Sequence, residues 1–191
     1  MKDEDRELHS YNGMVDQFTV TDERNGVEPE ATIELSLSSV DTSDDEESRG
    51  RIDVDEDVRG GQHTVAVHFE DSQVYPTGVG HDVHLICLDE TTSIDDVNGW
   101  MDWRDPNKLV SDGTEPGTFL GGVQNISTPE LMGRTDSDGQ GDDGGDGNGG
   151  EPVTAYVHVD LNPGAYAWVS EVPRPTDKGL LKPFIVPFEQ S

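Results

Sequence analysis

The residues of this chain best suited to chemistry are its histidines, because imidazole nitrogens bind borderline metal ions such as zinc and copper. His81 opens an apolar run, and His68 and His158 each project from the polar face of a segment that alternates apolar with polar residues. If neighbouring strands bring these histidines together with carboxylates, they could form a metal site. The alternative is that they are surface or hydrogen-bonded histidines without a ligand.

Spacing limits which donors can share one metal ion. His81 and His84 lie on opposite faces of an ideal strand, so both could be ligands only if the strand were kinked or bulged. Cys87, the one cysteine of the chain, follows His81 by six residues, which is roughly 20 Å along an extended strand at about 3.3 Å per residue. A shared His81–Cys87 site is therefore not expected, and Cys87 fits its apolar run as a small hydrophobic residue.

Sequence motifs of common enzyme classes are missing. The chain has no Gly-rich phosphate loop, no His-Glu-x-x-His motif, no nucleophile elbow and no Cys–His pair at a plausible spacing. Acidic pairs are frequent, but in a chain with 41 acidic residues they carry almost no specificity for acid–base catalysis. We therefore predict that the protein is not an enzyme.

The charge of the chain is its second strong feature. The 191 residues include 41 acidic and 12 basic side chains, which give a net charge of −29. Such an excess suits a protein in molar salt, where surface carboxylates hold hydrated cations, and it favours a salt-accumulating halophile as the source. Nucleic acid and anionic membranes are not expected as partners, because their binding depends on basic patches that the sequence lacks.

We predict that the fold loosens when salt is removed. The Debye length is about 3 Å at 1 M salt and about 30 Å at 0.01 M, so repulsion among the acidic side chains is screened in the first case and opposes compaction in the second. Circular dichroism spectra in molar salt and in dilute buffer measure the change. An unchanged spectrum in dilute buffer would contradict the prediction.

Hydropathy bears on localisation. No positively charged segment followed by an apolar one opens the chain, and no stretch approaches 18 apolar residues. We therefore expect neither a signal peptide nor a membrane span, and a cytoplasmic protein for the sequence as written. An extracellular protein is expected if a leader was removed before residue 1.

Alternating hydropathy predicts an all-β fold with one short helix. Strands are expected at 15–20, 31–37, 51–54, 64–69, 83–88, 153–161, 166–172 and 180–186. The helix is expected to start at Ser93, which can form a capping box with Asp96. Its apolar face would hold Ile94, Val97, Trp100 and Met101. Because recurring helical crossovers are missing, an antiparallel β-sandwich is favoured over a parallel sheet.

The remaining segments indicate one domain with long loops. Residues 1–15 are charged and unpatterned, and we expect a flexible acidic N-terminus there. Residues 16–188 are expected to form the single domain, with an insertion at 104–151 that begins as mixed loop through residue 132. Residues 133–151 are almost entirely Gly, Asp, Asn, Ser and Gln, which bury too little apolar surface to order, so a flexible, disordered acidic Gly-rich loop is predicted.

Three segments, in this order, resemble the cupredoxin superfamily of blue-copper proteins. They are Gly80-His81-Asp82-Val83-His84-Leu85, Leu161-Asn-Pro-Gly-Ala-Tyr-Ala-Trp-Val and the ending Gly179-Leu-Leu-Lys-Pro-Phe-Ile-Val. The resemblance is closest to uncharacterised cupredoxin-like domains and covers about residues 49–188, with 31–40 as a further strand. It implies a Greek-key β-sandwich.

The resemblance also implies where copper would bind. A blue-copper site uses two His nitrogens, one Cys sulfur and a weak axial ligand such as Met. His81 stands at the position of the first His ligand, but Ser170 occupies the Cys position and Leu180 the Met position. The segment 174–178, where the second His is expected, contains none. The resemblance therefore implies no intact type 1 copper site and no assigned cofactor, with His81 as the one candidate metal ligand.

Three functional hypotheses follow. The first is a non-catalytic cupredoxin-like binding or structural module with a protein partner that the sequence does not identify. The second is a metalloprotein, redox or enzymatic, that holds copper or zinc in a reshaped site with His81, and it predicts two histidine rings within ~5 Å of a common point. The third is a subunit of a larger assembly, in which the insertion at 104–151 closes over a partner.

Overall fold

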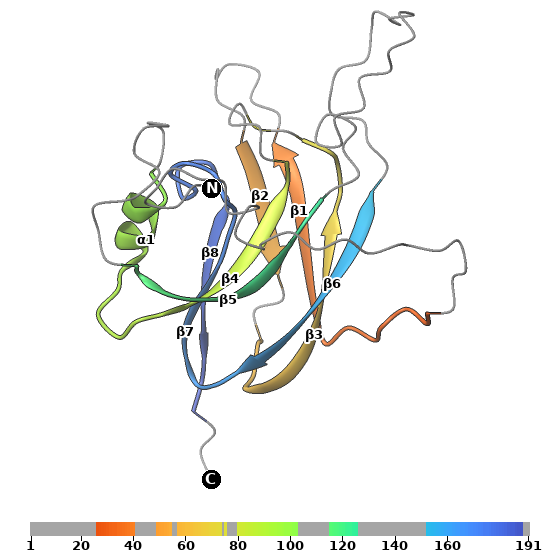
Figure 1. The fold of residues 1–191 in the computed structure, drawn as a ribbon, viewed down its shortest axis with the longest axis horizontal. Helices are drawn as coiled ribbons and strands as arrows, with labels where there is room; N and C mark the ends of the chain where they lie inside the picture. The colour runs from red at the N-terminus through yellow and green to blue at the C-terminus, as the bar shows by residue number, and fades with distance from the viewer. Residues whose placement is uncertain are drawn as a thin grey trace, which may run out of the picture.

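Two four-stranded β-sheets and one short helix make up the described part of the chain (Figure 1). The computed structural model describes residues 26–40, 49–54, 57–73, 75, 80–102, 115–125 and 152–188. The elements are β1 (Ile33–Val40), β2 (Arg49–Val54), β3 (Gly61–Phe69), β4 (Asp82–Leu88), α1 (Ile94–Trp100), β5 (Gly117–Gln124), β6 (Val153–Leu161), β7 (Gly164–Val169) and β8 (Leu181–Val186). The predicted all-β class with a short helix is confirmed for these residues.

The strand order is β2-β1-β3-β6 in one sheet and β5-β4-β7-β8 in the other. Every neighbouring pair is antiparallel except β1 and β3, which run parallel in the register Ile33↔Val65 to Leu37↔Phe69. This pair corrects the prediction of a purely antiparallel sandwich. β2 runs antiparallel to β1 on one side of it. The chain then reverses direction again and crosses to the other side of β1 as β3, which therefore runs parallel to β1. Alternating hydropathy indicates strands but not this neighbour order.

The core lies between the two sheets and follows the alternation of the strands. In β3, Val65, Val67 and Phe69 are fully buried on the inner face, as the period of two predicts. The opposite wall comes from the second sheet, where Leu85 and Trp168 are equally buried. The two sheets also contact each other along their edges, at β5 with β6 and at β2 with β8. The result is a two-layer β-structure with one apolar interior.

Helix α1 covers the outer face of the second sheet. Its Val97 and the following Met101 pack against Ile86 of β4 and against β7, so β4 is covered on both faces as its continuous apolar run predicts. The predicted capping box is present: Ser93 Oγ accepts a hydrogen bond from Asp96 N–H at 3.2 Å, and the Asp96 carboxylate accepts one from Ser93 N–H at 2.8 Å.

Strand β5 corrects the prediction of mixed loop across 104–132. It is rich in glycine, which hides the alternation that marks other strands. Close packing explains one of these glycines, because a Cβ at Gly122 would lie only 2.3 Å from the carbonyl oxygen of Val83 in β4. The predicted strand at 15–20, the acidic N-terminus at 1–15 and the Gly-rich loop at 133–151 lie outside the described residues. No helix in the described ranges is long and apolar enough to span a membrane.

Candidate functional site

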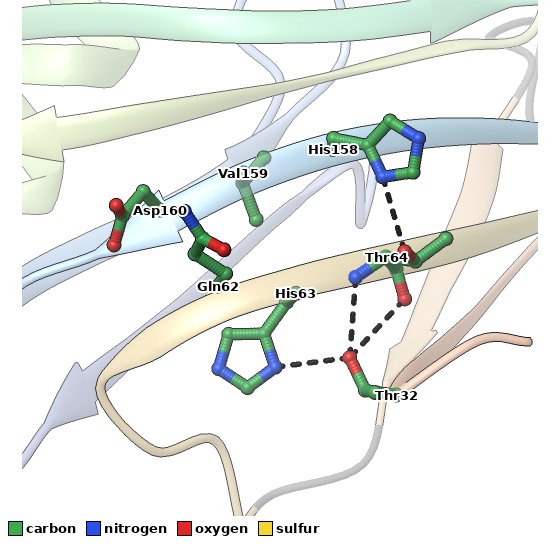
Figure 2. A pocket seen from close by; sticks show the side chains of 7 residues that line it. All are labelled: Thr32, Gln62, His63, Thr64, His158, Val159 and Asp160. Carbon is green, nitrogen blue, oxygen red and sulfur yellow. Dashed lines mark hydrogen bonds between the residues drawn. The ribbon is translucent and has the colours of Figure 1, made fainter.

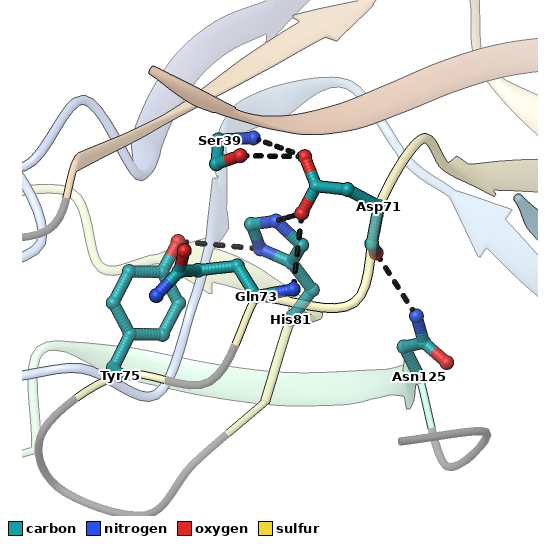
Figure 3. Close-up of polar contacts among 6 residues, drawn as sticks. All are labelled: Ser39, Asp71, Gln73, Tyr75, His81 and Asn125. Atoms are coloured by element: carbon teal, nitrogen blue, oxygen red, sulfur yellow. Dashed lines mark hydrogen bonds and ion pairs between the residues drawn. The ribbon is translucent and has the colours of Figure 1, made fainter. Parts of the chain in front are cut away.

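A cluster of hydrogen-bonded polar side chains lies at one end of the sandwich, where ends of strands from both sheets meet. We name it the His81 network, and Figure 3 shows its members, Ser39, Asp71, Gln73, Tyr75, His81 and Asn125. They come from the end of β1, from the segment after β3, from the residue before β4 and from the residue after β5. His81 itself has no exposed surface. The network therefore ties four strand ends together inside the molecule.

The Asp71 carboxylate is the centre of this network. Its Oδ2 accepts hydrogen bonds from the backbone N–H and the hydroxyl of Ser39, each at 2.7 Å. Its Oδ1 accepts from Gln73 N–H at 3.0 Å and from His81 Nε2 at 2.8 Å. Burial acts to raise the pKa of Asp71, but the hydrogen bonds from Ser39 and Gln73 outweigh burial and hold this pKa below its usual value. Asp71 is thus a stable, fully hydrogen-bonded carboxylate.

The contacts of His81 define its tautomer. Burial raises the pKa of Tyr75, and the negative charges of Asp71 and Asp82 add to the effect, so its hydroxyl stays protonated and donates to His81 Nδ1 at 3.2 Å. Burial also lowers the pKa of His81, although Asp71 and Asp82 oppose this shift. His81 is therefore neutral, with its proton on Nε2 facing Asp71. Both ring nitrogens are used in hydrogen bonds.

Backbone contacts lock the same residues in place. The N–H of His81 donates to Gln73 O at 3.1 Å, and the carbonyl of His81 accepts from Asn125 N–H at 2.7 Å. The side-chain amide of Asn125 donates to Asp71 O at 3.1 Å. His81 is held by its backbone as well as by its ring, so coordination of a metal would require it to give up an existing hydrogen bond.

A second polar group lies on the other face of β4. Asp82 and His84 are two residues apart and share this face, and Glu171 follows β7 two residues after Val169, which pairs with His84. His84 Nε2 lies 3.1 Å from Asp82 Oδ2 and 3.8 Å from Glu171 Oε1. The hydrogen bond with Asp82 raises the pKa of His84, against an opposing effect of burial. We name these three residues the Asp82–His84–Glu171 group.

The Asp82 carboxylate is held from behind by the segment that follows β7. Ser170 Oγ donates to Asp82 Oδ1, and Glu171 N–H donates to both carboxylate oxygens at 3.1 and 3.0 Å. Asp82 is only 2% exposed, whereas His84 is 26% and Glu171 58% exposed. The group therefore has a buried, oriented end and an end open to solvent.

The predicted ligand positions of the cupredoxin resemblance are occupied as follows. Ser170, at the Cys position, is fully buried and hydrogen-bonds Asp82. Leu180, at the Met position, is fully buried in the core. Residues 174–180 form a tight turn, in which Leu180 N–H donates to Pro175 O at 2.8 Å. These positions provide packing and hydrogen bonds.

His68 and His158 have partners of their own on the β3–β6 sheet. His68 Nε2 lies 2.5 Å from Glu34 Oε2, and His68 Nδ1 lies 3.0 Å from Thr154 Oγ1. His158 Nδ1 lies 3.0 Å from Thr64 Oγ1. All these contacts are exposed to solvent, whereas the ring of His81 is buried between Asp71 and Tyr75. The hydrogen bonds thus place His81 in a different setting from His68 and His158.

An open pocket of about 430 Å³ lies beside His158 on the same sheet (Figure 2). His63 also reaches this pocket, where its Nδ1 lies 3.0 Å from Thr32 Oγ1 and its Nε2 lies 2.9 Å from Arg59 O. The lining residues are Thr32, Gln62, His63, Thr64, His158, Val159 and Asp160. Figure 2 shows the two histidine rings hydrogen-bonded to separate threonines. Nothing in this geometry directs both rings to one ligand.

We predict that acid destabilises the fold through His81. Its pKa lies below the ordinary 6.5 in the folded protein, so the unfolded chain takes up the proton first and stability falls as pH drops below about 6.5. Asp82, Asp71 and Tyr75 are the titratable groups that face His81. His84 acts oppositely, because its raised pKa gives stability that is lost as the pH rises above the ordinary histidine pKa of 6.5.

Urea unfolding in molar salt between pH 5 and 8 measures the change in the free energy of unfolding, and His81→Gln should lose less stability than wild type at the acid end of this range. An equal acid loss in His81→Gln would contradict this prediction.

Sequence reasoning found part of this end of the molecule. It singled out His81, Ser170 and Leu180, and the structure buries all three. It missed Asp71, and it missed Glu171 as a neighbour of His84; the Asp82-x-His84 spacing on one strand face was the one available signal for that group. Comparison of the chain with family models, with curated proteins and with solved structures found no match.

Proposed function

We propose that the protein is a non-catalytic, cupredoxin-like binding or structural module of a halophile, in which the His81 network replaces a copper site. The observation that carries this proposal is that both ring nitrogens of His81 are hydrogen-bonded, to Asp71 and to Tyr75. A copper ligand needs a free imidazole lone pair. Here the lone pair on Nδ1 accepts a hydrogen bond from the Tyr75 hydroxyl.

The residues at the other copper positions support the same proposal. Type 1 copper depends on a soft thiolate in its trigonal plane. Ser170 offers a hydroxyl that is already donating to Asp82, and Leu180 offers only hydrocarbon to the core. Cys87 is the sole thiol of the chain and lies at the far end of β4 from His81.

A His81 network that only stabilises the fold is consistent with a protein that binds its partners through its surface. Hydrogen bonds from Ser39, Gln73 and Asn125 join the ends of β1, β3 and β5 around Asp71, which fixes these strand ends relative to one another. We propose that the module binds a protein partner and carries hydrated cations on its acidic exterior. The third hypothesis, a subunit closed by the insertion at 104–151, is a form of this proposal, and of that insertion the structure describes 115–125.

The alternative is a metalloprotein that binds copper or zinc through His81 and a second histidine, on the same fold. It has less support, because His68 and His158 hydrogen-bond exposed partners on the first sheet while His81 is buried against Asp71. For this alternative to hold, His81 would have to leave the network on metal binding.

Elemental analysis tests the proposal. Wild-type protein and His81→Gln are purified in molar salt without chelators and measured before and after addition of copper and zinc, with His158→Gln as the matched control. Glutamine can still donate to Asp71, so the variant should fold. We expect the same metal content in all three proteins and no copper–thiolate absorption band. Metal present in wild type and His158→Gln but lost in His81→Gln would overturn the proposal.

A further inference from the structure

We propose that the Asp82–His84–Glu171 group binds a divalent metal ion of the zinc class. This inference goes beyond the proposed function, and none of the three proposed ligands stands at a position that the cupredoxin resemblance assigns to copper. Each residue offers one ligand atom, and the three atoms lie within 4.8 Å of one another. Among the described residues, no other group of three or more histidine, cysteine or acidic side chains satisfies this spacing.

The distances fit a tetrahedral ion that takes the place of the proton in the hydrogen bond between His84 Nε2 and Asp82 Oδ2. Donors at about 2.1 Å from zinc in tetrahedral geometry are separated from each other by about 3.4 Å. His84 Nε2 lies 3.1 Å from Asp82 Oδ2 and 3.8 Å from Glu171 Oε1, so the two separations lie on either side of this value. The exposed Glu171 side chain can swing toward the ion to close the larger separation. The third separation, between carboxylate oxygens of Asp82 and Glu171, is within 4.8 Å.

The surrounding contacts prepare the site for a metal. Ser170 Oγ and Glu171 N–H hold the Asp82 carboxylate in place, and hydrogen bonds of this kind orient a ligand and raise metal affinity. The backbone position of His84 is fixed by pairing with Val169 on one side and Gly122 on the other. The buried Asp82 is thus a prearranged ligand, and Glu171 at the surface leaves a path for the ion to enter.

The donor chemistry selects the class of ion. One imidazole and two carboxylates neutralise a divalent cation, and this mixed nitrogen–oxygen set suits zinc or manganese better than copper(I), which prefers thiolate and thioether sulfur. Three protein ligands leave a fourth position for water. The His68–Glu34 pair elsewhere on the surface has one imidazole and one carboxylate, which makes it a natural comparison.

Cobalt(II) titration in molar potassium chloride, with excess magnesium to occupy the acidic surface, tests the proposal. Wild type should bind one equivalent with the visible ligand-field bands of a low-coordinate nitrogen–oxygen site, and zinc should displace it. His84→Gln and Glu171→Gln should each weaken binding by more than the roughly 10- to 100-fold that loss of a group hydrogen-bonded to a ligand costs. Ser170→Ala should fall within that range. His68→Gln is the matched control and should bind as wild type does.

The outcomes separate this inference from the proposed function. Circular dichroism in molar salt first establishes that each variant is folded, and Glu171→Gln is the decisive variant because its side chain is 58% exposed. Weak binding without ligand-field bands, equal in wild type, Glu171→Gln and His68→Gln, would overturn the metal site and leave the proposed function intact. Binding lost in His81→Gln but kept in Glu171→Gln would overturn both. Binding lost in Glu171→Gln and kept in His81→Gln is the result we expect.

Discussion

Asp71→Ala is expected to lower the free energy of unfolding by roughly 2–4 kcal/mol, because each buried donor left without its acceptor costs about 1–3 kcal/mol. The substitution removes the acceptor of four hydrogen bonds, from Ser39 N–H and Oγ, Gln73 N–H and His81 Nε2–H. The His81 donor would remain in the interior without its acceptor, and the Ser39 and Gln73 donors would remain partly buried without theirs. Unsatisfied buried donors carry the full cost of their desolvation. Urea unfolding at neutral pH in molar salt measures the loss.

Asp53→Ala is the matched control for this experiment. Asp53 pairs with Arg51 on the surface of β2, where the two side chains are 51% and 67% exposed. An exposed pair of this kind contributes about 0–1 kcal/mol, so the control should unfold close to wild type. If Asp71→Ala were no less stable than Asp53→Ala, Asp71 would not be the centre of a stabilising network.

Gly179→Ala is expected to destabilise the fold by more than about 2 kcal/mol. Gly179 has φ of +75°, where an L-residue costs roughly 1–2 kcal/mol. An added Cβ would also lie 2.4 Å from the carbonyl oxygen of Gly50 in β2, and the neighbouring backbone is held by a 2.9 Å hydrogen bond from Gly50 N–H to Lys178 O. The turn and β2 would have to separate to admit the methyl group.

Gly99→Ala provides the opposite expectation with the same chemical change. Gly99 lies in α1, and a Cβ there would meet nothing within 4 Å. Replacement of glycine by alanine inside a helix stabilises by roughly 0.5–1 kcal/mol. Thermal unfolding of the two variants in molar salt compares them, and equal midpoints would show that the Gly179 turn is not constrained as its geometry indicates.

The elements that the sequence predicts well are those with a strong local pattern. β3 and β6 alternate clearly, and α1 carries both its capping box and its apolar face in adjacent residues. β5 was missed because its glycines interrupt the alternation of apolar and polar residues. Gly122 is there for another reason, since it allows the backbone of β5 to pack closely on β4. The parallel pairing of β1 with β3 depends on where the chain crosses, which no local pattern records.

The residues of the His81 network were also predicted only in part. His81 was recognisable because it opens an apolar strand, but its partner Asp71 lies ten residues earlier in a segment without periodicity, and Ser39 comes from a different strand. In a chain with 41 acidic residues, a single Asp gives no sign that it will be buried. Only the folded arrangement shows that Asp71 accepts four hydrogen bonds while Asp53 stays at the surface.

Long-range proton–nitrogen NMR of the imidazole rings, recorded in molar salt with and without one equivalent of zinc, tests most directly whether His81 is a hydrogen-bonded residue instead of a metal ligand. We expect His81 to show the neutral tautomer with its proton on Nε2, unchanged by zinc, because Asp71 and Tyr75 occupy both ring nitrogens. We expect the Nε2 signal of His84 to shift. A zinc-induced shift at a ring nitrogen of His81 would contradict the assignment of His81 to a metal-free network.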